Sequence, residues 1–328
     1  MDYRTRSRRS GNILAFGLAF VLLAFSLWVG TSSAGEPVKY PARPVRILVP
    51  AGAGGSLGRE IRTLTPFLEK RLGVSLPVEY ITGADGMICY NKLYQEKPDG
   101  YTLISFNLSS AISIEVTRDT AKYEVRKQTP VAVWNVKTHV FVTHPDKWKT
   151  FAEFLSDAKK KPVSLAVVGG SSAFQGYLME SALGLKINWV PYMDSAESMA
   201  AVAGKHADGL LTFTISPIPM IRAGRLRPLN VFSLTADPIL PDVPNMKDVG
   251  HTEVPLVLVY GVIMTPPNTP KEYASILEAA IKDATSTAEF KKLAENTGIT
   301  VNFSPASELQ KLIAANYEIL TKYKQFIR

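Results

Sequence analysis

The sequence holds few of the side chains that metal sites and redox chemistry use. Its single cysteine, Cys89, excludes a disulfide within the chain and lies in an apolar stretch, where we expect it to pack as a small hydrophobic residue. The four histidines, His139, His144, His206 and His251, are scattered. Only the first two are close, and their positions on an expected strand end and loop suit one metal ion poorly. We therefore expect no metal site and no cofactor.

Signals for nucleic-acid binding and for nucleophilic catalysis are also missing. No basic run with interleaved aromatic residues occurs, although the formal net charge is +8. A moderately basic surface instead favours small anionic ligands. No G-x-S-x-G motif occurs, and Ser56 and Ser171 have no histidine near them in the sequence that would activate a hydroxyl. The sequence thus predicts neither a nucleic-acid partner nor a hydrolase.

One long apolar segment stands at the start of the chain. Residues 13–29 carry no charge, four arginines precede them, and a run of small residues ends at Ala34. This order predicts a signal peptide at 1–34 that is cleaved after Ala34, and therefore a periplasmic protein. The alternative is a retained N-terminal membrane anchor, since the run falls just short of the roughly 20 residues that a span needs. Removing four Arg and one Asp with the leader lowers the net charge from +8 to +5.

The most informative stretch is 45–58, a short apolar strand that runs into a glycine-rich loop and then a helix. The strand reads as buried on both faces, as in a parallel sheet. Glycines at 52, 54, 55 and 58 free the loop to turn with unblocked N–H groups, and Ser56 is a candidate N-cap for the helix. Such a loop at a helix N-terminus predicts an anion site made of main chain.

The pattern of strand, loop and helix recurs along the first half of the chain. Strand 78–81 leads into a second glycine turn, Gly83–Gly86, and strand 101–106 ends at Asn107. Units repeated at about 30-residue intervals favour right-handed βαβ connections and an α/β fold with mainly parallel sheets. In such sheets a ligand lies beyond the carboxyl ends of the strands, where both glycine turns and Asn107 should emerge.

A similar unit recurs in the second half. Strand 163–168 leads into the loop 169–172, Gly-Gly-Ser-Ser, with a helical pattern behind it. Two loops of one design predict two domains that face one central cleft, and 294 residues after the leader are enough for two cores. We expect domain 1 to comprise 35–138 plus 258–328, domain 2 to comprise 139–257, and hinges near 135–139 and 255–260.

The candidate ligand-binding residues come from these loops and strand ends. The three serines among them are also plain candidates for helix caps, Tyr192 is as well suited to packing beneath the cleft as to lining it, and Asp208 is alternatively a turn residue. The predicted set is Ala51, Gly52, Gly54, Gly55, Ser56, Leu57, Gly83, Asp85, Gly86, Met87, Asn107, Gly170, Ser171, Ser172, Gln175, Tyr192 and Asp208.

A dinucleotide-dependent enzyme is the competing interpretation of the first loop. Residues 52–58 resemble the G-x-G-x-x-G fingerprint, and Glu79 ends the next strand where a ribose-binding acid would stand. The spacing fails, because Leu57 occupies the position of the third glycine. Export would also separate the chain from the cytoplasmic nucleotide pool, so we expect a binding protein and not an enzyme.

An ordered set of short motifs extends over nearly the whole chain after the leader. These motifs are Tyr40–Arg46, Val49–Pro50 with Gly54–Ser56, Gly83–Ala84 with Gly86, Pro98–Leu103, Val190–Tyr192, Gly204 with Asp208, Ala223–Arg227, Leu240–Pro244, Gly250 and Thr265–Pro270. In this order they resemble the solute-binding proteins of tripartite tricarboxylate transporters, also called the Bug family.

The resemblance implies a monomeric periplasmic flytrap that closes on a small carboxylate and docks on an integral-membrane permease. A sensor that docks on a signalling partner is the alternative. Ligands in this family are typically dicarboxylates, tricarboxylates, acidic amino acids or aromatic acids, held largely by main-chain N–H groups. The chain departs from the family pattern at Gly58, where Asp is usual, and at Gly176, where His is common, with Gln175 as a possible substitute donor. The resemblance therefore leaves the identity of the ligand open.

Overall fold

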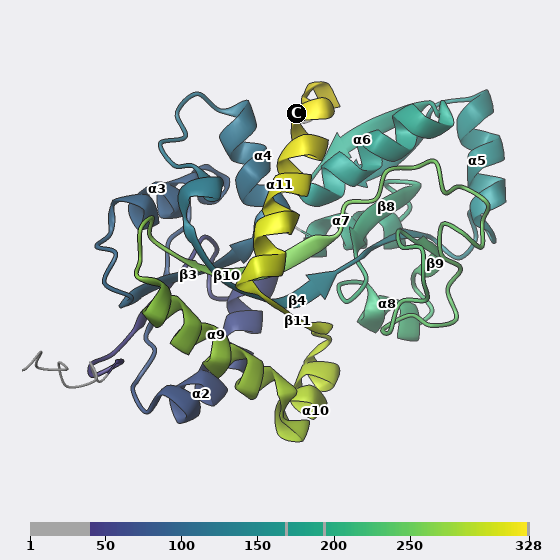
Figure 1. The fold of residues 1–328 in the computed structure, drawn as a ribbon. Coiled ribbons are helices and arrows are strands. Elements are labelled where there is room, and N and C mark those ends of the chain that lie inside the picture. Colours follow the sequence, from purple (N-terminus) through teal and green to yellow (C-terminus); the bar gives the residue numbers. More distant parts are fainter. Residues whose placement is uncertain (1–39, 168–169, 193–194, 327–328) are drawn as a thin grey trace, which may run out of the picture. The chain divides into compact units, whose positions relative to one another are not determined.

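The computed structural model describes residues 40–167, 170–192 and 195–326 (Figure 1). The predicted signal peptide lies outside these residues, as does Gly169 of the second glycine loop. Residues from Pro41 onward form one unit, and it contains both sheets described below. Among the described helices, none combines the length and the apolar character that crossing a bilayer requires.

The first sheet has six strands in the order β11-β4-β10-β3-β1-β2. Residues 47–49 of β1 are fully buried, as the continuous apolar run predicts for a strand covered on both faces. The strands of this sheet are β1 (Arg46–Val49), β2 (Val78–Tyr80), β3 (Thr102–Asn107), β4 (Thr129–Lys137), β10 (Val259–Thr265) and β11 (Val301–Pro305).

The second sheet has five strands in the order β7-β6-β8-β5-β9. Its central strands are again apolar and buried, because helices cover both of its faces. The strands are β5 (His139–Thr143), β6 (Val163–Val167), β7 (Ile187–Pro191), β8 (Gly209–Phe213) and β9 (Arg227–Val231). The chain therefore has the two-domain α/β architecture that the repeated units predicted.

Both sheets are mixed, which corrects the prediction of mainly parallel sheets. Strands β1, β2 and β3 pair in parallel, as do β6, β7 and β8, but β10 runs antiparallel to β3 and β4, and β5 runs antiparallel to β8 and β9. The reason lies in the connections between the sheets. A strand that enters a sheet at the edge where its neighbours end must run against them, and β5 and β10 both enter in this way.

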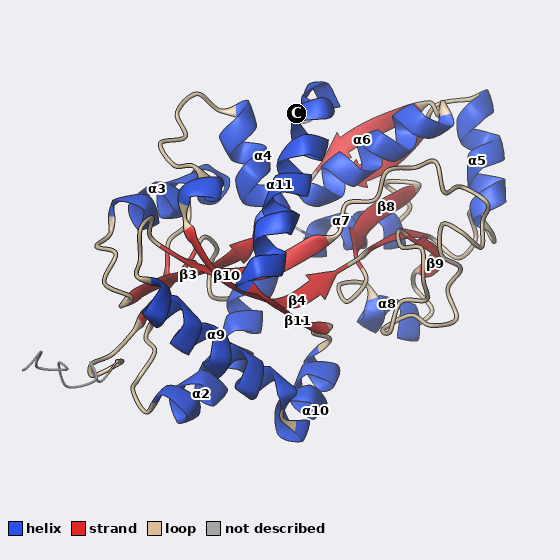
Figure 2. Ribbon diagram, viewed as in Figure 1, coloured by secondary structure: helices blue, strands red, loops and turns tan. Residues whose placement is uncertain are grey.

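Helices pack beside both sheets (Figure 2). Those associated with the first sheet are α2 (Ser56–Leu72), α3 (Met87–Gln95), α4 (Leu108–Thr117), α9 (Lys271–Ser286), α10 (Ala288–Thr297) and α11 (Ala306–Lys322). Those associated with the second sheet are α5 (Phe151–Lys160), α6 (Ser171–Leu183), α7 (Ser195–Ala203) and α8 (Ile218–Arg222). Three short 3₁₀ segments, η1 (Ala84–Gly86), η2 (Val125–Lys127) and η3 (Lys324–Phe326), complete the described elements.

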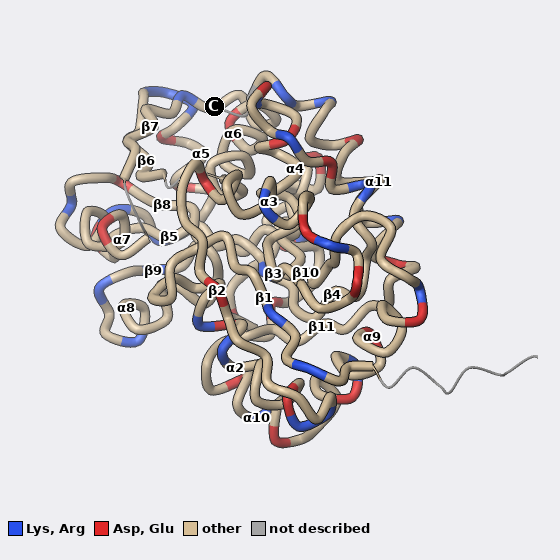
Figure 3. The backbone as a smooth tube through the Cα atoms, turned by 90° about the vertical axis from the view of Figure 1, so that its left-hand side faces the viewer, with Lys and Arg blue, Asp and Glu red and all other residues tan. Residues whose placement is uncertain are grey.

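Each sheet has its own buried cluster, but one helix contributes to both parts of the molecule. The second sheet packs on an aromatic cluster that includes Phe141, Trp148 and Phe154. Helix α6 follows β6 of the second sheet, yet its residues Phe174 and Leu178 belong to the buried cluster of the first sheet. Figure 1 shows α6 beside the carboxyl-terminal part of α11. Figure 3 shows that positive and negative residues are interspersed along the backbone in both parts of the molecule.

Candidate functional site

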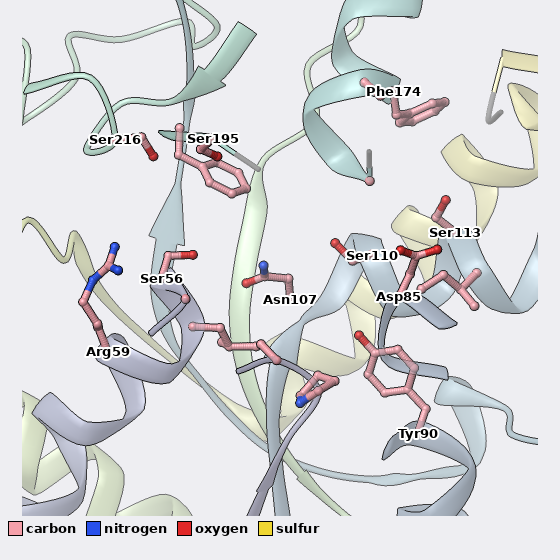
Figure 4. A pocket seen from close by; sticks show the side chains of 18 of the residues that line it. Ser56, Arg59, Asp85, Tyr90, Asn107, Ser110, Ser113, Phe174, Ser195 and Ser216 are labelled. Atoms are coloured by element: carbon pink, nitrogen blue, oxygen red, sulfur yellow. The ribbon is translucent and has the colours of Figure 1, made fainter. Parts of the chain in front are cut away.

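A pocket of about 990 Å³ lies where strands of both sheets end. Loops after β1 and β3 supply one side, and loops after β6 and β8 supply the other. Figure 4 shows Ser56, Arg59, Ser195 and Ser216 at one end, Asp85, Tyr90 and Ser113 at the other, and Asn107 between them. Of the predicted residues, those that line it are Ala51, Gly54, Gly55, Ser56, Leu57, Asp85, Asn107 and Gly170.

The first glycine loop presents the start of α2 to the pocket. Gly55 is the N-cap, with an extended backbone and no side-chain cap, so Ser56 is the first helical residue and not the cap that the sequence suggested. The N–H groups of the first turn have no partner within a helix, and they carry its positive end. Arg59 and Arg62 each donate to a loop carbonyl, at 2.6 Å from Gly54 O and Ala53 O. These bonds fix the loop against its own helix.

Gly58 explains why this loop departs from the family pattern. A Cβ atom at this position would lie 2.6 Å from the Gly52 oxygen and 2.8 Å from the Ala53 oxygen. The loop therefore packs directly on the helix, and an aspartate at residue 58 would require a different loop. Gly52 itself belongs to the turn, where its oxygen accepts from Gly55 N at 3.0 Å, and it does not line the pocket.

The second glycine turn has an unusual backbone. All four residues from Gly83 to Gly86 have positive φ, between +47° at Ala84 and +114° at Gly83. Such angles are strained for Ala84 and Asp85, and strain of this kind is common at ligand sites. Arg118, the C-cap of α4, holds the turn by donating to Ala84 O at 3.3 Å and by pairing with the Asp85 carboxylate.

Only Asp85 of this turn lines the pocket. Gly86 packs on the first loop instead, because a Cβ atom there would lie 2.8 Å from Pro50 Cβ. Gly83 and Met87 also lie outside the lining, so their predicted ligand contact remains a prediction that depends on a change in this turn. Within the second turn, Gly86 therefore supports the first loop, and Asp85 contributes to the pocket lining.

Helix α4 and its N-cap contribute a polar row, of which the sequence predicted only Asn107. Asn107, Ser110, Ser113 and Thr117 recur at intervals of three or four residues, which places them along one side of a helix, and all of them line the pocket. Apart from Ser109 and Glu115, the other residues of α4 are apolar, so the segment resembles part of a core. Polar residues at helical spacing within an apolar segment were the available signal.

The third helix start comes from the second sheet. Gly170 is the N-cap of α6 with φ +79° and ψ −142°, a conformation open to glycine alone. Ala173, Phe174 and Tyr177 of the same helix line the pocket. Ser171 and Ser172, which were predicted to line it, are 6% and 8% exposed and do not.

Gln175, predicted as a ligand donor, and Gly176 beside it both pack against other parts of the protein. The Gln175 side chain is fully buried, donates to Pro255 O at 3.0 Å and accepts from Val257 N at 2.7 Å. It therefore ties α6 to the segment that leads into β10, and it does not line the pocket. At Gly176, a Cβ atom would lie 2.4 Å from the Trp189 ring, so the ring occupies the space that a side chain would need.

Tyr192 and Asp208 also lie away from the pocket lining. Tyr192 packs against an apolar cluster of the second sheet. Asp208 accepts from Ser164 N at 2.9 Å and pairs with Lys147 at 2.7 Å, which agrees with the alternative role in a turn. Their contact with a ligand remains a prediction.

The electrostatics of the pocket favour an anion. Its described lining includes Arg59, Arg118 and Asp85 as charged side chains, and the last two neutralise each other. The starts of α2, α4 and α6 add positive helix ends from both domains. Cys89 is buried, which raises its pKa to about 12, so its thiol is protonated at neutral pH. No group of three potential metal ligands occurs among the residues that the structure describes.

Comparisons with known proteins support the two-domain α/β fold. The protein BugT of Bordetella pertussis is 26% identical over 278 residues, which cover 80% of this chain and 84% of BugT. The structure of the periplasmic binding protein BugD is 25% identical with a TM-score of 0.74, and the match covers 86% of this chain and 98% of BugD. A Rhodopseudomonas palustris protein solved with adipate shares the fold, with 21% identity, a TM-score of 0.77 and coverage of 88% and 98%.

The family comparison is the most direct. Residues 61–328 match the model of the tripartite tricarboxylate transporter family receptor. This range covers most of the chain, including the whole second sheet and every strand of the first sheet except β1. The chain therefore belongs to the tripartite tricarboxylate transporter receptor family, whose members are solute-binding proteins.

Proposed function

We propose that this protein captures a small organic acid in the periplasm, in the pocket between the two sheets, and delivers it to a membrane permease. The observation that carries the proposal is the convergence of three helix starts, those of α2, α4 and α6, on one pocket. The N-terminus of an α-helix presents free N–H groups and the positive end of the helix dipole, so it binds anionic groups. The related protein that was solved with adipate supports a ligand of this chemistry and size.

Binding and closure follow from the chemistry of these groups. A ligand carboxylate accepts from N–H groups of the first turns of α2 and α6, and Ser56 and Asn107 supply side-chain donors. Closure of the domains over the ligand would remove water, so each of these hydrogen bonds would become stronger. The hinges are the two crossings between the sheets, near 135–139 and 255–260. No bond in the ligand is broken in this scheme.

Thermal unfolding of residues 35–328 tests the proposal. The panel comprises adipate, malate, citrate, glutamate and benzoate, with hexanol as a neutral control. A carboxylate at about 100 times its dissociation constant should add about 2.7 kcal/mol to the free energy of unfolding. A clear rise in melting temperature with one class of acid would support the proposal, and no shift with any acid would contradict it.

A valine at Gly55 provides a variant that separates binding from folding. A Cβ atom at Gly55 would lie 3.3 Å from the Gly52 oxygen, and the larger side chain would cover the N–H groups at the start of α2. We expect Gly55→Val to melt within a few degrees of the wild type and to lose the ligand-induced shift. Asn302→Val, which places the same side chain at an exposed position on β11, is the matched control and should retain the shift.

Delivery to a permease is tested by uptake. Cells that lack this chain should lose uptake of the labelled acid identified in the panel, and expression of wild-type chain should restore it. Restoration should fail with Gly55→Val. Normal uptake in cells without the chain would contradict delivery and would favour the sensor interpretation, in which the liganded protein docks on a signalling partner.

A further inference from the structure

A buried ion pair lies directly beneath the pocket. Lys137 at the end of β4 places its Nζ 2.8 Å from Glu60 Oε2 of α2, and the two side chains are only 8% and 9% exposed. Burial of two charges costs several kcal/mol per ion before their attraction is counted, and apolar pairs of similar size are often as stable. Stability alone therefore gives little reason for this pair, and its position next to the pocket suggests another role.

Lys137 also contacts a residue of the pocket. Its Nζ donates to Asn107 Oδ1 at 2.7 Å. An ammonium group has donors and no acceptor, so the oxygen of the Asn107 amide must face Lys137. The NH₂ group of the same amide then points away from the ammonium. Figure 4 shows the Asn107 amide in the middle of the pocket, between Ser56 and Ser110.

The surroundings of the pair fit this arrangement closely. Asn135 Nδ2 donates to Glu60 Oε2 at 3.2 Å, so the same carboxylate oxygen contacts both Lys137 and Asn135. Asn135 can lie there because its neighbour in the sheet is Gly261, where a Cβ atom would fall 2.1 Å from Asn135 Oδ1. Gly261 pairs with Asn107 on its other side. The glycine thus makes room for a polar network in the middle of a sheet that is otherwise apolar.

We propose that Lys137, held by Glu60, is a positioning residue that turns the Asn107 amide so that its NH₂ group donates to the ligand at the middle of the pocket. The ligand atom opposite Asn107 is then a hydrogen-bond acceptor, such as a carboxylate or hydroxyl oxygen, and not an ammonium. This inference rests on the proposed function, because it assigns a part of the same site.

Two variants test the inference with the five carboxylates of the panel as probes in titration calorimetry. Asn107→Asp keeps the shape of the side chain and pairs with Lys137, so we expect a melting temperature at or above that of the wild type. It replaces the donor by a carboxylate that repels an anion, and binding should be lost. Lys137→Met/Glu60→Met removes both charges together, should still fold, and should weaken binding about tenfold or more, the effect of losing one good donor to a charged group.

A double-mutant cycle distinguishes positioning from a general structural effect. If Lys137 acts through Asn107, adding Asn107→Ala to Lys137→Met/Glu60→Met should cost no further affinity. The control is Lys311→Met/Glu308→Met, which removes an exposed ion pair of 3.0 Å on α11 and should bind like the wild type.

The outcomes separate this inference from the proposed function. If wild-type protein binds an acid but Asn107→Asp binds it equally well, the inference is overturned and the proposed function stands. The same holds if the losses of affinity from Asn107→Ala and from Lys137→Met/Glu60→Met simply add. If the charge-free pair fails to fold, undiminished binding by Asn107→Asp still overturns the inference. If wild-type protein binds no acid of the panel, the proposed function fails and the inference fails with it.

Discussion

At the scale of single residues, glycine occurs at different positions of the first loop for different structural reasons. Gly54 has no heavy atom within 4 Å of the position of a Cβ atom, whereas Gly58, four residues later, faces two loop oxygens at under 3 Å. The sequence groups them in one motif. The structure shows that Gly58 permits the close approach of the loop to α2, and that Gly54 leaves the pocket lining open.

This difference leads to a prediction for alanine substitutions. Gly58→Ala should push the loop away from α2 and lower the free energy of unfolding by about 1–3 kcal/mol, the usual cost of overpacking. Gly54→Ala should change it by much less, because the added methyl group meets nothing. Urea unfolding of both variants measures the difference. Equal stability of the two would show that the loop adjusts freely at residue 58.

His139 is a second residue with a measurable consequence. Its side chain is fully buried at the start of β5 and stacks on Phe213, with ring centroids 5.1 Å apart. Burial lowers the pKa of His139 to about 3. In the unfolded chain the pKa is about 6.5. Below pH 6.5 the unfolded state therefore binds a proton that the folded state does not, and the stability falls as the pH falls.

Through His139 alone, the free energy of unfolding should fall by about 1.4 kcal/mol for each pH unit between about pH 6 and pH 4. His139→Phe keeps an aromatic ring beside Phe213 but cannot take up a proton, so its free energy of unfolding should fall less steeply with pH than that of the wild type. His206→Phe, at an exposed position, should retain the wild-type slope. Urea unfolding at pH 7, 6, 5 and 4 gives the three slopes. Parallel curves for wild type and His139→Phe would contradict the prediction.

At the scale of elements, the predictable parts were those set by local sequence. The strand before each glycine loop follows from its apolar run, and the chain divides into α9 and α10 at Thr287, whose side chain caps α10. Helix α4 was not predicted because its many apolar residues, which pack into the first core, hide the helical spacing of Ser110 and Ser113, which line the pocket. Strand β11 was missed because its weakly apolar residues form a strand only by pairing with β4.

Helix α5 is an element whose start depends on identifiable contacts. Thr150, its N-cap, accepts from Glu153 N at 3.2 Å, and Glu153 Oε2 accepts from Lys149 N at 2.7 Å. The Glu153 carboxylate thus bonds to the residue before the cap, and not to the Thr150 N–H as in a capping box. The Thr150 side chain still caps the helix, so Thr150→Ala should lower the free energy of unfolding by about 1 kcal/mol. Binding of the ligand should not change, since α5 does not line the main pocket. Calorimetry of unfolding and of binding checks both parts, and a loss of affinity would contradict the separation.

At the scale of the whole molecule, the sequence predicted two units and one cleft, and the fold has two sheets with one pocket at their ends. The composition of that pocket was only partly predictable. Residues of the first loop and Asn107 emerge where parallel strands must place them, but Tyr90, Arg118 and Phe213 reach it through tertiary packing between segments far apart in the chain. For the same reason Gln175, which stands close to the loop at 169–172 in the sequence, has its partners elsewhere.

The packing of α6 predicts how the two domains unfold. Leu178 is 1% exposed and belongs to the same cluster as Ile112 of α4 and Ile313 of α11, although α6 follows a strand of the second sheet. This contact and the two chain crossings join the domains, so we expect wild-type protein to unfold in one transition. Leu178→Ala removes apolar contact where the domains meet, costs about 2–5 kcal/mol, and should allow the domains to unfold separately.

Tryptophan fluorescence can follow each domain, because Trp134 lies in β4 and Trp148 and Trp189 lie with the second sheet. A Trp148→Phe/Trp189→Phe background reports on the first domain, and a Trp134→Phe background on the second. The urea midpoints of these two backgrounds should coincide. They should separate when Leu178→Ala is added to each background. Leu165→Ala, in the core of the second sheet, is the matched control, and its two midpoints should shift together. Coincident midpoints in Leu178→Ala would show that the chain crossings alone couple the domains.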